Sequence, residues 1–122
     1  MRLLLDTHVF IWWDNAKLPK SVTARIQRAE DVLVSAVTAW EISIKSALGK
    51  IAARGSVAEA IADYGFTELP ISAAHGDAVR SLPPHHRDPF DRMLVAQAIV
   101  EDLVIVSSDE AMARYKVPLV WK

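Results

Sequence analysis

The chain lacks cysteine altogether, and none of its apolar runs is long enough to cross a membrane. Disulfides are therefore excluded. Zinc is not expected either, because the four histidines show no ligand spacing. Asp6 interrupts the N-terminal leucines too early for the apolar core of a secretory signal. These absences predict a cytoplasmic protein with no membrane segment.

An excess of charge of one sign is also missing, since the net charge is −1. Any contact with nucleic acid must then come from a local group of basic residues rather than from the whole surface. The chain has no glycine-rich phosphate loop, so a nucleoside triphosphate is not the expected substrate.

What the chain does have is the composition of a globular protein. It contains 122 residues, of which 52% are hydrophobic and 24% are charged. Such values are typical of a folded protein rather than a disordered one. A chain of this length has room for one hydrophobic core, so residues 1–122 are expected to form a single domain.

Strand and helix patterns alternate along the sequence. Buried strands are predicted for 2–6, 31–35, 103–108 and 117–121, with a short extended piece at 66–72. Helices are predicted for 7–13, 17–30, 38–49, 56–65, 72–82, 88–102 and 109–115. The helix over 88–102 is apolar nearly all round, which is typical of a central, well-covered helix. The pattern predicts an α/β fold whose mostly parallel sheet has helices on both faces.

Acidic residues fall near one edge of this predicted sheet. Asp6 and Asp109 each follow a strand, and Glu41 lies in the first turns of a helix that follows another strand. Asp88 and Asp91 open the helix before the fourth strand, and a helix antiparallel to the strands begins at their carboxyl ends. In open parallel sheets, functional sites form beyond those ends. Four separate stretches of sequence can therefore offer carboxylates to one site.

Each acid also has a purely structural explanation. Asp6, Asp88 and Asp109 precede helices, where aspartate is a preferred N-cap that complements the helix dipole. Glu41 could pair with Lys45 one turn further on, a solvated contact worth about 0.3–0.5 kcal/mol.

Two of the acids fit that explanation less well. Asp91 begins a stripe that continues with Val95 and Ala98, so this side of its helix is apolar. Asp6 is flanked by apolar runs on both sides. Carboxylates gathered at one partly buried place repel and raise one another's pKa values, and a divalent cation removes that conflict. Oxygen ligands alone favour Mg²⁺ or Mn²⁺, which suggests chemistry at phosphate.

Four segments, in this order, carry a resemblance to a known family: MRLLLDTHVFIWW, VSAVTAWEISIKSALGKI, LPPHHRDPFDRMLVAQAI and IVSSDEAMARYKVPLVW. Together they resemble the PIN-domain ribonucleases, and most closely the VapC-type toxins of bacterial toxin–antitoxin pairs. The resemblance spans essentially the whole chain. It implies a PIN-like three-layer fold, with a mostly parallel central sheet between helices.

The resemblance also implies a catalytic site that holds Mg²⁺ or Mn²⁺. The family's first acid falls on Asp6, the second on Glu41 within AWEIS and the third on Asp91 within DRMLVAQA. The more variable fourth acid falls on Asp109 within SSDE. Thr7 matches a hydroxyl beside the first acid that helps to order the site.

Further candidates flank the third acid. Asp88 adds a carboxylate just before Asp91, and either member of the pair could lie nearer the metal; the family alignment favours Asp91. Arg87 and Arg92 could position RNA phosphates, which need point charges rather than base readout. The alternative for each arginine is a solvated helix surface or an ion pair with a nearby acid.

The function implied by the resemblance is that of an endoribonuclease toxin. It would cleave RNA with a water activated by the metal, and the expected substrate is tRNA or another structured RNA cut at a loop. A cognate antitoxin is expected to neutralise it, and such toxins usually form homodimers. Trp12 and Trp13, two large aromatic residues on a short helix, are candidates for a partner-binding surface.

Two other classes of protein share part of this pattern. A receiver-type signalling domain also has acids at the carboxyl edge of a parallel sheet. It would need paired acids after the first strand and a lysine after the last, whereas Asp6 stands alone and the fourth strand ends SSDE. A PIN-like module that binds RNA or protein without cleavage is the other alternative, and retention of all four acids argues against it.

Overall fold

The computed structural model describes residues 1–52, 55–84 and 88–122. These residues form a five-stranded sheet in the order β3-β2-β1-β4-β5, and every pair of neighbouring strands is parallel. The strands are β1 (Arg2–Leu5), β2 (Asp31–Ser35), β3 (Thr67–Leu69), β4 (Val104–Val106) and β5 (Leu119–Val120). The predicted α/β class is therefore confirmed, and the sheet is parallel throughout.

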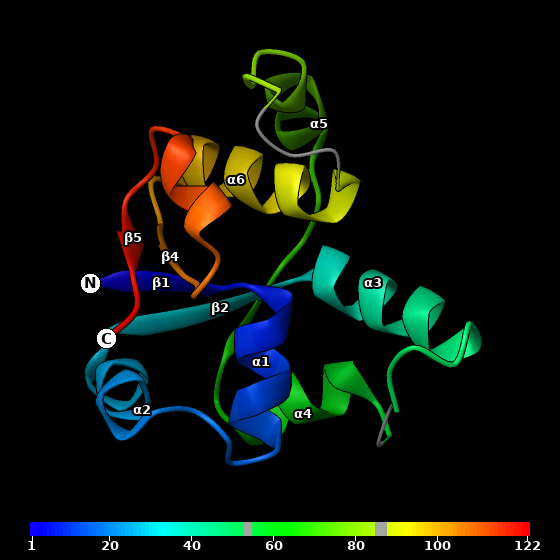
Figure 1. The fold of residues 1–122 in the computed structure, drawn as a ribbon, viewed down its shortest axis with the longest axis vertical. Helices are drawn as coiled ribbons and strands as arrows, with labels where there is room; N and C mark the ends of the chain where they lie inside the picture. The colour runs from blue at the N-terminus through cyan, green and yellow to red at the C-terminus, as the bar shows by residue number, and fades with distance from the viewer. Residues whose placement is uncertain (53–54, 85–87) are drawn as a thin grey trace.

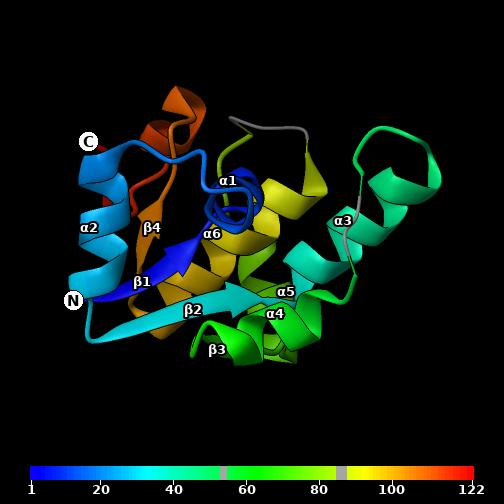
Figure 2. The ribbon, with the colours of Figure 1, turned by 90° about the horizontal axis from the view of Figure 1, so that it is seen from below.

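Helices cover both faces of this sheet, as the three-layer prediction requires. They are α1 (Thr7–Asp14), α2 (Lys20–Arg28), α3 (Ala36–Ala47), α4 (Val57–Asp63), α5 (Ala73–Val79), α6 (Pro89–Glu101) and the 3-10 helix η1 (Glu110–Arg114). Figure 1 shows α5, α6 and η1 on one side of the sheet and α1, α2 and α4 on the other. Helix α3 continues beyond the carboxyl end of β2 and projects away from the sheet (Figure 2).

The central strand β1 explains why the chain opens with three leucines. Leu4 packs into one core cluster with residues of α6 and η1, while Leu3 and Leu5 pack into a second cluster with residues of α1, α2 and α4. All three leucines are almost completely buried. A strand covered on both faces has no side that favours polar residues.

The helix boundaries follow local sequence signals. The N-cap side chains of Asp6, Ser35, Ser56, Ser72 and Asp88 each accept a hydrogen bond from a backbone N–H in the first turn of the helix that follows. This satisfies donors that a helix start leaves unpaired. The predicted starts of α1, α4, α5 and α6 agree with these caps to within one residue, whereas α3 begins at Ala36 rather than at 38, and α2 begins at Lys20 rather than at 17, without a side-chain cap.

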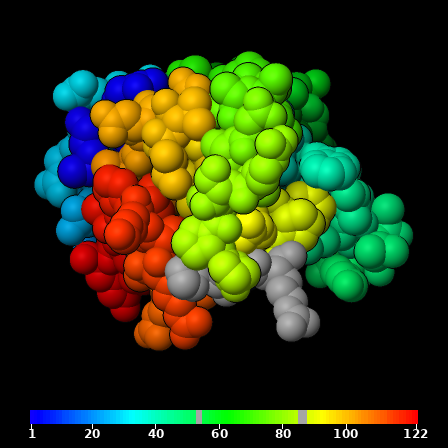
Figure 3. Space-filling view, turned by 90° about the horizontal axis from the view of Figure 1, so that it is seen from above, coloured from blue at the N-terminus to red at the C-terminus, as the bar shows by residue number. Residues whose placement is uncertain are grey.

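Helix α6 differs in part from the prediction of a fully covered helix. Its middle residues from Leu94 to Ala98 are buried, but Ile99 and Val100 are 48% and 42% exposed. Figure 3 shows α5 lying across one part of α6 and leaving the rest of its outer side open. The apolar character of the last turn therefore does not reflect burial within this chain.

Two smaller differences concern the C-terminal part of the chain. The strands predicted over 103–108 and 117–121 are shorter in the structure, and the helix predicted over 109–115 is a 3-10 helix. Within the described part of the chain, no helix combines the length and apolarity that a membrane crossing needs.

Candidate active site

The predicted acids stand near the carboxyl edge of the sheet, on separate elements. Asp6 follows β1, and Glu41 lies on α3, which begins directly after β2. Asp88 and Asp91 stand at the start of α6, which runs antiparallel to the strands and therefore begins at the same edge. Helix α3 packs against both α1 and α6. Asp109 begins η1 after β4.

Asp6 is a buried carboxylate, only 6% exposed. Its Oδ1 accepts a hydrogen bond from the Val9 N–H at 3.1 Å, so Asp6 is the N-cap of α1 as well as a site candidate. Its Oδ2 accepts a hydrogen bond from the Ser107 hydroxyl at 2.5 Å. Burial raises the pKa of Asp6, and the two hydrogen bonds oppose this shift. Desolvation, rather than the mutual repulsion of the acids, is therefore the main cause of the raised pKa of Asp6.

Ser107 links Asp6 to the fourth acid. Leu5 and Val106 are partners in the register of β1 and β4, so the residues that follow them, Asp6 and Ser107, lie beside each other. The Ser107 hydroxyl donates to Asp6 and accepts the N–H of Asp109 at 3.0 Å. Asp109 itself is exposed and caps η1. Sequence reasoning missed Ser107, although its position at the end of a strand in the SSDE segment is a usable signal.

Glu41 is even more deeply buried than Asp6, at 2% exposed. Its Oε1 accepts a hydrogen bond from the Thr7 hydroxyl at 2.6 Å, and the hydroxyl groups of Thr7 and Thr38 are 3.2 Å apart. Thr7 follows Asp6 directly in the chain, so its hydrogen bond to Glu41 connects the first two acids. Sequence reasoning missed Thr38, one turn before Glu41 on α3.

The second oxygen of Glu41 has a cationic partner. Its Oε2 is 2.5 Å from Nζ of Lys45, one turn further along α3. The sequence suggested a solvated contact for this pair, but Glu41 is buried, so the ion pair is partly shielded from solvent. The pKa of Lys45 is raised, first by its hydrogen bond to Glu41 and also by the charges of Asp88 and Asp91. The carboxylates of α6 therefore act on the same ammonium group as Glu41.

The first turn of α6 holds Asp88 and Asp91 in different roles. The Oδ1 atom of Asp88 accepts hydrogen bonds from the N–H groups of Phe90 at 2.8 Å and Asp91 at 3.3 Å, so Asp88 is the N-cap. Phe90 packs edge-on against Trp40 of α3, with ring centroids 5.0 Å apart. This aromatic contact fixes the start of α6 against the helix that carries Glu41.

Arg92 has contacts that favour an ordering role. Its guanidinium group donates hydrogen bonds to the carbonyl oxygens of Val79, Leu82 and Pro83, at 3.2, 3.3 and 2.8 Å. These bonds tie the end of α5 and the following segment to α6. Arg87, the other predicted phosphate contact, lies outside the described residues.

The donor chemistry of this edge fits a hard divalent cation. All the candidate ligands are carboxylate oxygens, and Asp6 is a buried carboxylate without an ion pair among the described residues. Within the described ranges, no three acidic or histidine side chains gather into a complete ligand set. Mg²⁺ commonly binds through one or two carboxylates and keeps several waters, so a complete protein cage is not required.

The comparisons with known proteins agree with the fold. The sequence profile of the PIN domain matches residues 3–118, so the chain belongs to the PIN domain family. Ribonuclease VapC22 of Mycobacterium tuberculosis is 28% identical to it over 125 residues, which cover 95% of this chain and 93% of that protein. The resemblance seen in the sequence to VapC-type PIN proteins is confirmed.

Solved structures share the fold at lower identity. VapBC2 from Rickettsia felis, bound to a DNA fragment from its promoter, has a TM-score of 0.75 at 14% identity and covers 100% of this chain and 99% of its own. DNA-bound VapBC from Salmonella typhimurium has a TM-score of 0.70 at 15% identity, with 99% and 98% covered. FitAcB from Neisseria gonorrhoeae has a TM-score of 0.65 at 22% identity, with 96% and 95% covered.

Proposed function

We propose that this chain is a metal-dependent endoribonuclease and that a partner protein restrains it, as in a toxin–antitoxin pair. The observation that carries the proposal most directly is the buried pair of acids, Asp6 and Glu41, joined through Thr7 at the carboxyl edge of the sheet. Membership of the PIN domain family and the likeness to Ribonuclease VapC22 support the same activity.

The acids that would hold Mg²⁺ or Mn²⁺, directly or through waters that the ion keeps, are Asp6, Glu41, Asp91 and Asp109. A divalent ion bound there supplies activation of a water and neutralisation of charge at the phosphorus atom. Asp6 contributes a rigidly held carboxylate, because its two oxygens are fixed by Val9 and Ser107. Thr7 and Glu41 hold each other in place, which reduces the reorganisation needed when substrate binds.

The proposed substrate is RNA, with tRNA or another structured RNA cut at a loop as the expected target. Proteins reach the bases of RNA mainly in loops and single strands, because the major groove of an A-form helix is too narrow. Since the net charge is −1, phosphate contacts would have to be local. Such a substrate also favours action in the cytoplasm, where tRNA is present.

The test of the activity is a cleavage assay with purified protein, using tRNA and a single-stranded RNA oligomer. We expect cleavage with Mg²⁺ or Mn²⁺ and none in excess chelator. An Asp6→Asn protein purified in the same way is the control for contaminating nuclease. Full activity in chelator would contradict the metal mechanism. Binding of RNA without cleavage under any metal condition would favour the non-catalytic module instead.

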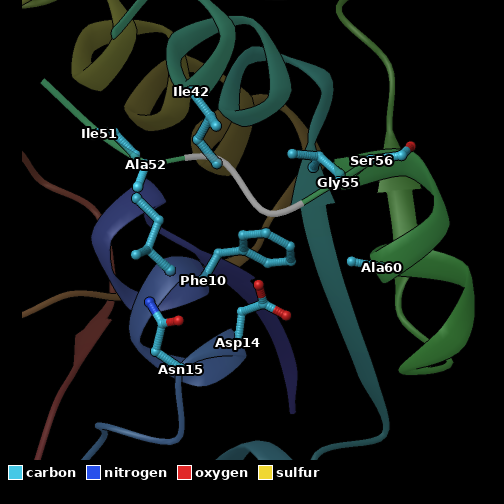
Figure 4. A pocket seen from close by; sticks show the side chains of 11 residues that line it. Phe10, Asp14, Asn15, Ile42, Ile51, Ala52, Gly55, Ser56 and Ala60 are labelled. Atoms are coloured by element: carbon cyan, nitrogen blue, oxygen red, sulfur yellow. The ribbon is translucent and has the colours of Figure 1, made fainter. Parts of the chain in front are cut away.

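The proposed antitoxin would bind on the side of the molecule formed by α1, the end of α3 and α4. A small pocket there is lined by apolar residues such as Phe10, Ile42 and Ile51, together with the polar side chains of Asp14 and Asn15 (Figure 4). Several of the similar solved structures are VapBC or toxin–antitoxin complexes, which supports a protein partner for this chain as well. The homodimer expected from the family stays a prediction, which sedimentation analysis would check.

A further inference from the structure

Lys45 lies in an unusual position for a lysine on an outward-projecting helix. Its Nζ is 2.5 Å from Oε2 of Glu41, and the Lys45 side chain is 25% exposed while that of Glu41 is 2% exposed. The other oxygen of Glu41 accepts the Thr7 hydroxyl. Both carboxylate oxygens of Glu41 are therefore engaged, one by a neutral donor and one by a cation.

The ammonium group also lies in the field of other acids of the site. Asp88 and Asp91, which come from α6 rather than α3, both favour the charged form of Lys45. The ion pair with Glu41 is the principal interaction of this ammonium group, and the charges of Asp88 and Asp91 act on it more weakly. A positive charge close to these acids offsets part of their mutual repulsion.

A divalent ion that takes the lone pair of Glu41 Oε2 on which this ammonium group lies has to displace it, because both cations compete for the same position. Resting on the proposed metal-dependent function, we propose that Lys45 is a positioning residue that competes with the divalent ion for Glu41 and thereby sets the metal affinity of the site. The ammonium group would hold Oε2 of Glu41 when no metal is bound and would turn towards solvent if a divalent ion took its place.

The chemistry of lysine suits this exchange. Its charge sits on a flexible four-carbon stem and is strongly hydrated, so it can turn towards solvent without a large conformational change. The side chain already reaches solvent in part. Glu41, in contrast, is held by Thr7, so the carboxylate stays in place while the lysine moves.

The experiment compares Mn²⁺ binding by the full chain and by three variants, using calorimetric titration and thermal unfolding without RNA. Lys45→Met removes the competing charge and keeps most of the side-chain length. Lys45→Arg keeps the charge. Lys50→Met removes the charge of an exposed lysine just beyond α3 and serves as the matched control. If Lys45→Met does not fold, Lys45→Gln replaces it as the neutral variant.

We expect the neutral variant to bind Mn²⁺ about tenfold or more tightly than the wild type, because one close charge changes such equilibria by roughly one to three powers of ten. Its melting temperature should be lower than that of the wild type without metal and should rise more on addition of Mn²⁺. Lys45→Arg and Lys50→Met should bind Mn²⁺ with nearly the wild-type affinity. This pattern separates competition from a merely structural role, which would weaken metal binding.

Unchanged or weaker Mn²⁺ binding by the neutral variant, with clear binding by the wild type, would overturn the inference and leave the proposed function intact. Tighter binding by Lys50→Met to the same degree would also overturn it, since the effect would then be one of overall charge. Absence of Mn²⁺ binding by the wild type and by every variant would count against the proposed function itself.

Discussion

Asp6 is both the N-cap of a helix and a buried carboxylate. It caps α1 through Val9, and it is a buried charge at the end of the central strand. A cap needs only an acceptor, so the ordinary structural explanation accounts for its position but not for its burial. Burying a carboxylate in the ionised form is costly, so the burial of Asp6 points to a functional reason for this residue.

Asp6→Asn separates the cap from the charge. Asparagine caps as well as aspartate, and its amide can donate to the Ser107 hydroxyl while its oxygen keeps the Val9 N–H. We expect RNA cleavage to fall to background and stabilisation by Mg²⁺ to be lost. Without metal, the variant should be more stable than the wild type near neutral pH, as measured by thermal unfolding.

The sign of that stability change follows from the pKa. Burial raises the pKa of Asp6 above its ordinary value of 3.8, so the ionised group destabilises the folded protein increasingly as the pH rises past that value. The advantage of Asp6→Asn should therefore appear towards neutral pH and disappear in acid, where Asp6 is protonated in both states. An Asp6→Asn protein that still cleaves RNA and still gains stability from Mg²⁺ would contradict the assignment.

Helix α6 begins with two acids, of which the sequence favoured Asp91 as the metal ligand and left Asp88 as a candidate for both cap and ligand. Asp88 accepts hydrogen bonds from the N–H groups of Phe90 and Asp91, so its position is explained by capping. Asp91 does not cap the helix; it stands in the first turn on the side that continues into the buried Val95. Capping therefore explains the position of Asp88 but not that of Asp91.

This difference predicts opposite outcomes for two matched variants. Asp88→Asn keeps the cap and should leave stability within a few tenths of a kcal/mol and cleavage largely intact, whereas Asp88→Ala should cost about 1 kcal/mol. Asp91→Asn should abolish cleavage. Urea unfolding and the RNA cleavage assay measure both effects. Loss of cleavage in Asp88→Asn at unchanged stability would instead make Asp88 a ligand.

At the scale of the whole molecule, the aromatic residues of α1 lie on the side opposite to α5 and α6. Trp12 and Trp13 are both half-buried, and they line a hollow with Leu18 and Tyr64. Trp13 packs on Phe66, with ring centroids 5.4 Å apart. Large aromatic residues that remain half-exposed around a hollow are typical anchors for a protein partner.

We therefore predict that partner binding protects these tryptophans from a soluble quencher such as acrylamide. Fluorescence quenching should decrease when a purified cognate antitoxin is added. The decrease should be smaller in Trp12→Phe or Trp13→Phe, which identifies the residue concerned. Trp40, which is 55% exposed and lies on α3, can be silenced as Trp40→Phe to reduce background. Quenching that stays unchanged on complex formation would rule out this side as the binding surface.

Much of this architecture could be read from the sequence, because its signals are local. The leucines of β1 indicate a strand that is buried on both faces. The residues that cap α1, α4 and α6 indicate where these helices begin. The order of strands and helices then restricts the fold to a parallel sheet with two helical layers. This order of elements also predicts that Asp6 and Glu41 lie at the carboxyl edge of the sheet.

Contacts between distant parts of the chain were decided only by the tertiary structure. The register of β1 against β4 places Ser107 on Asp6, and the packing of α1 against α3 places Thr7 on Glu41. The same packing buries Glu41 and turns its pairing with Lys45 from a solvated contact into a charge-compensating one. Periodicity and capping describe neighbours within one element. Burial, by contrast, depends on what packs against that element, so the sequence by itself located these acids, while only the fold determined their partners.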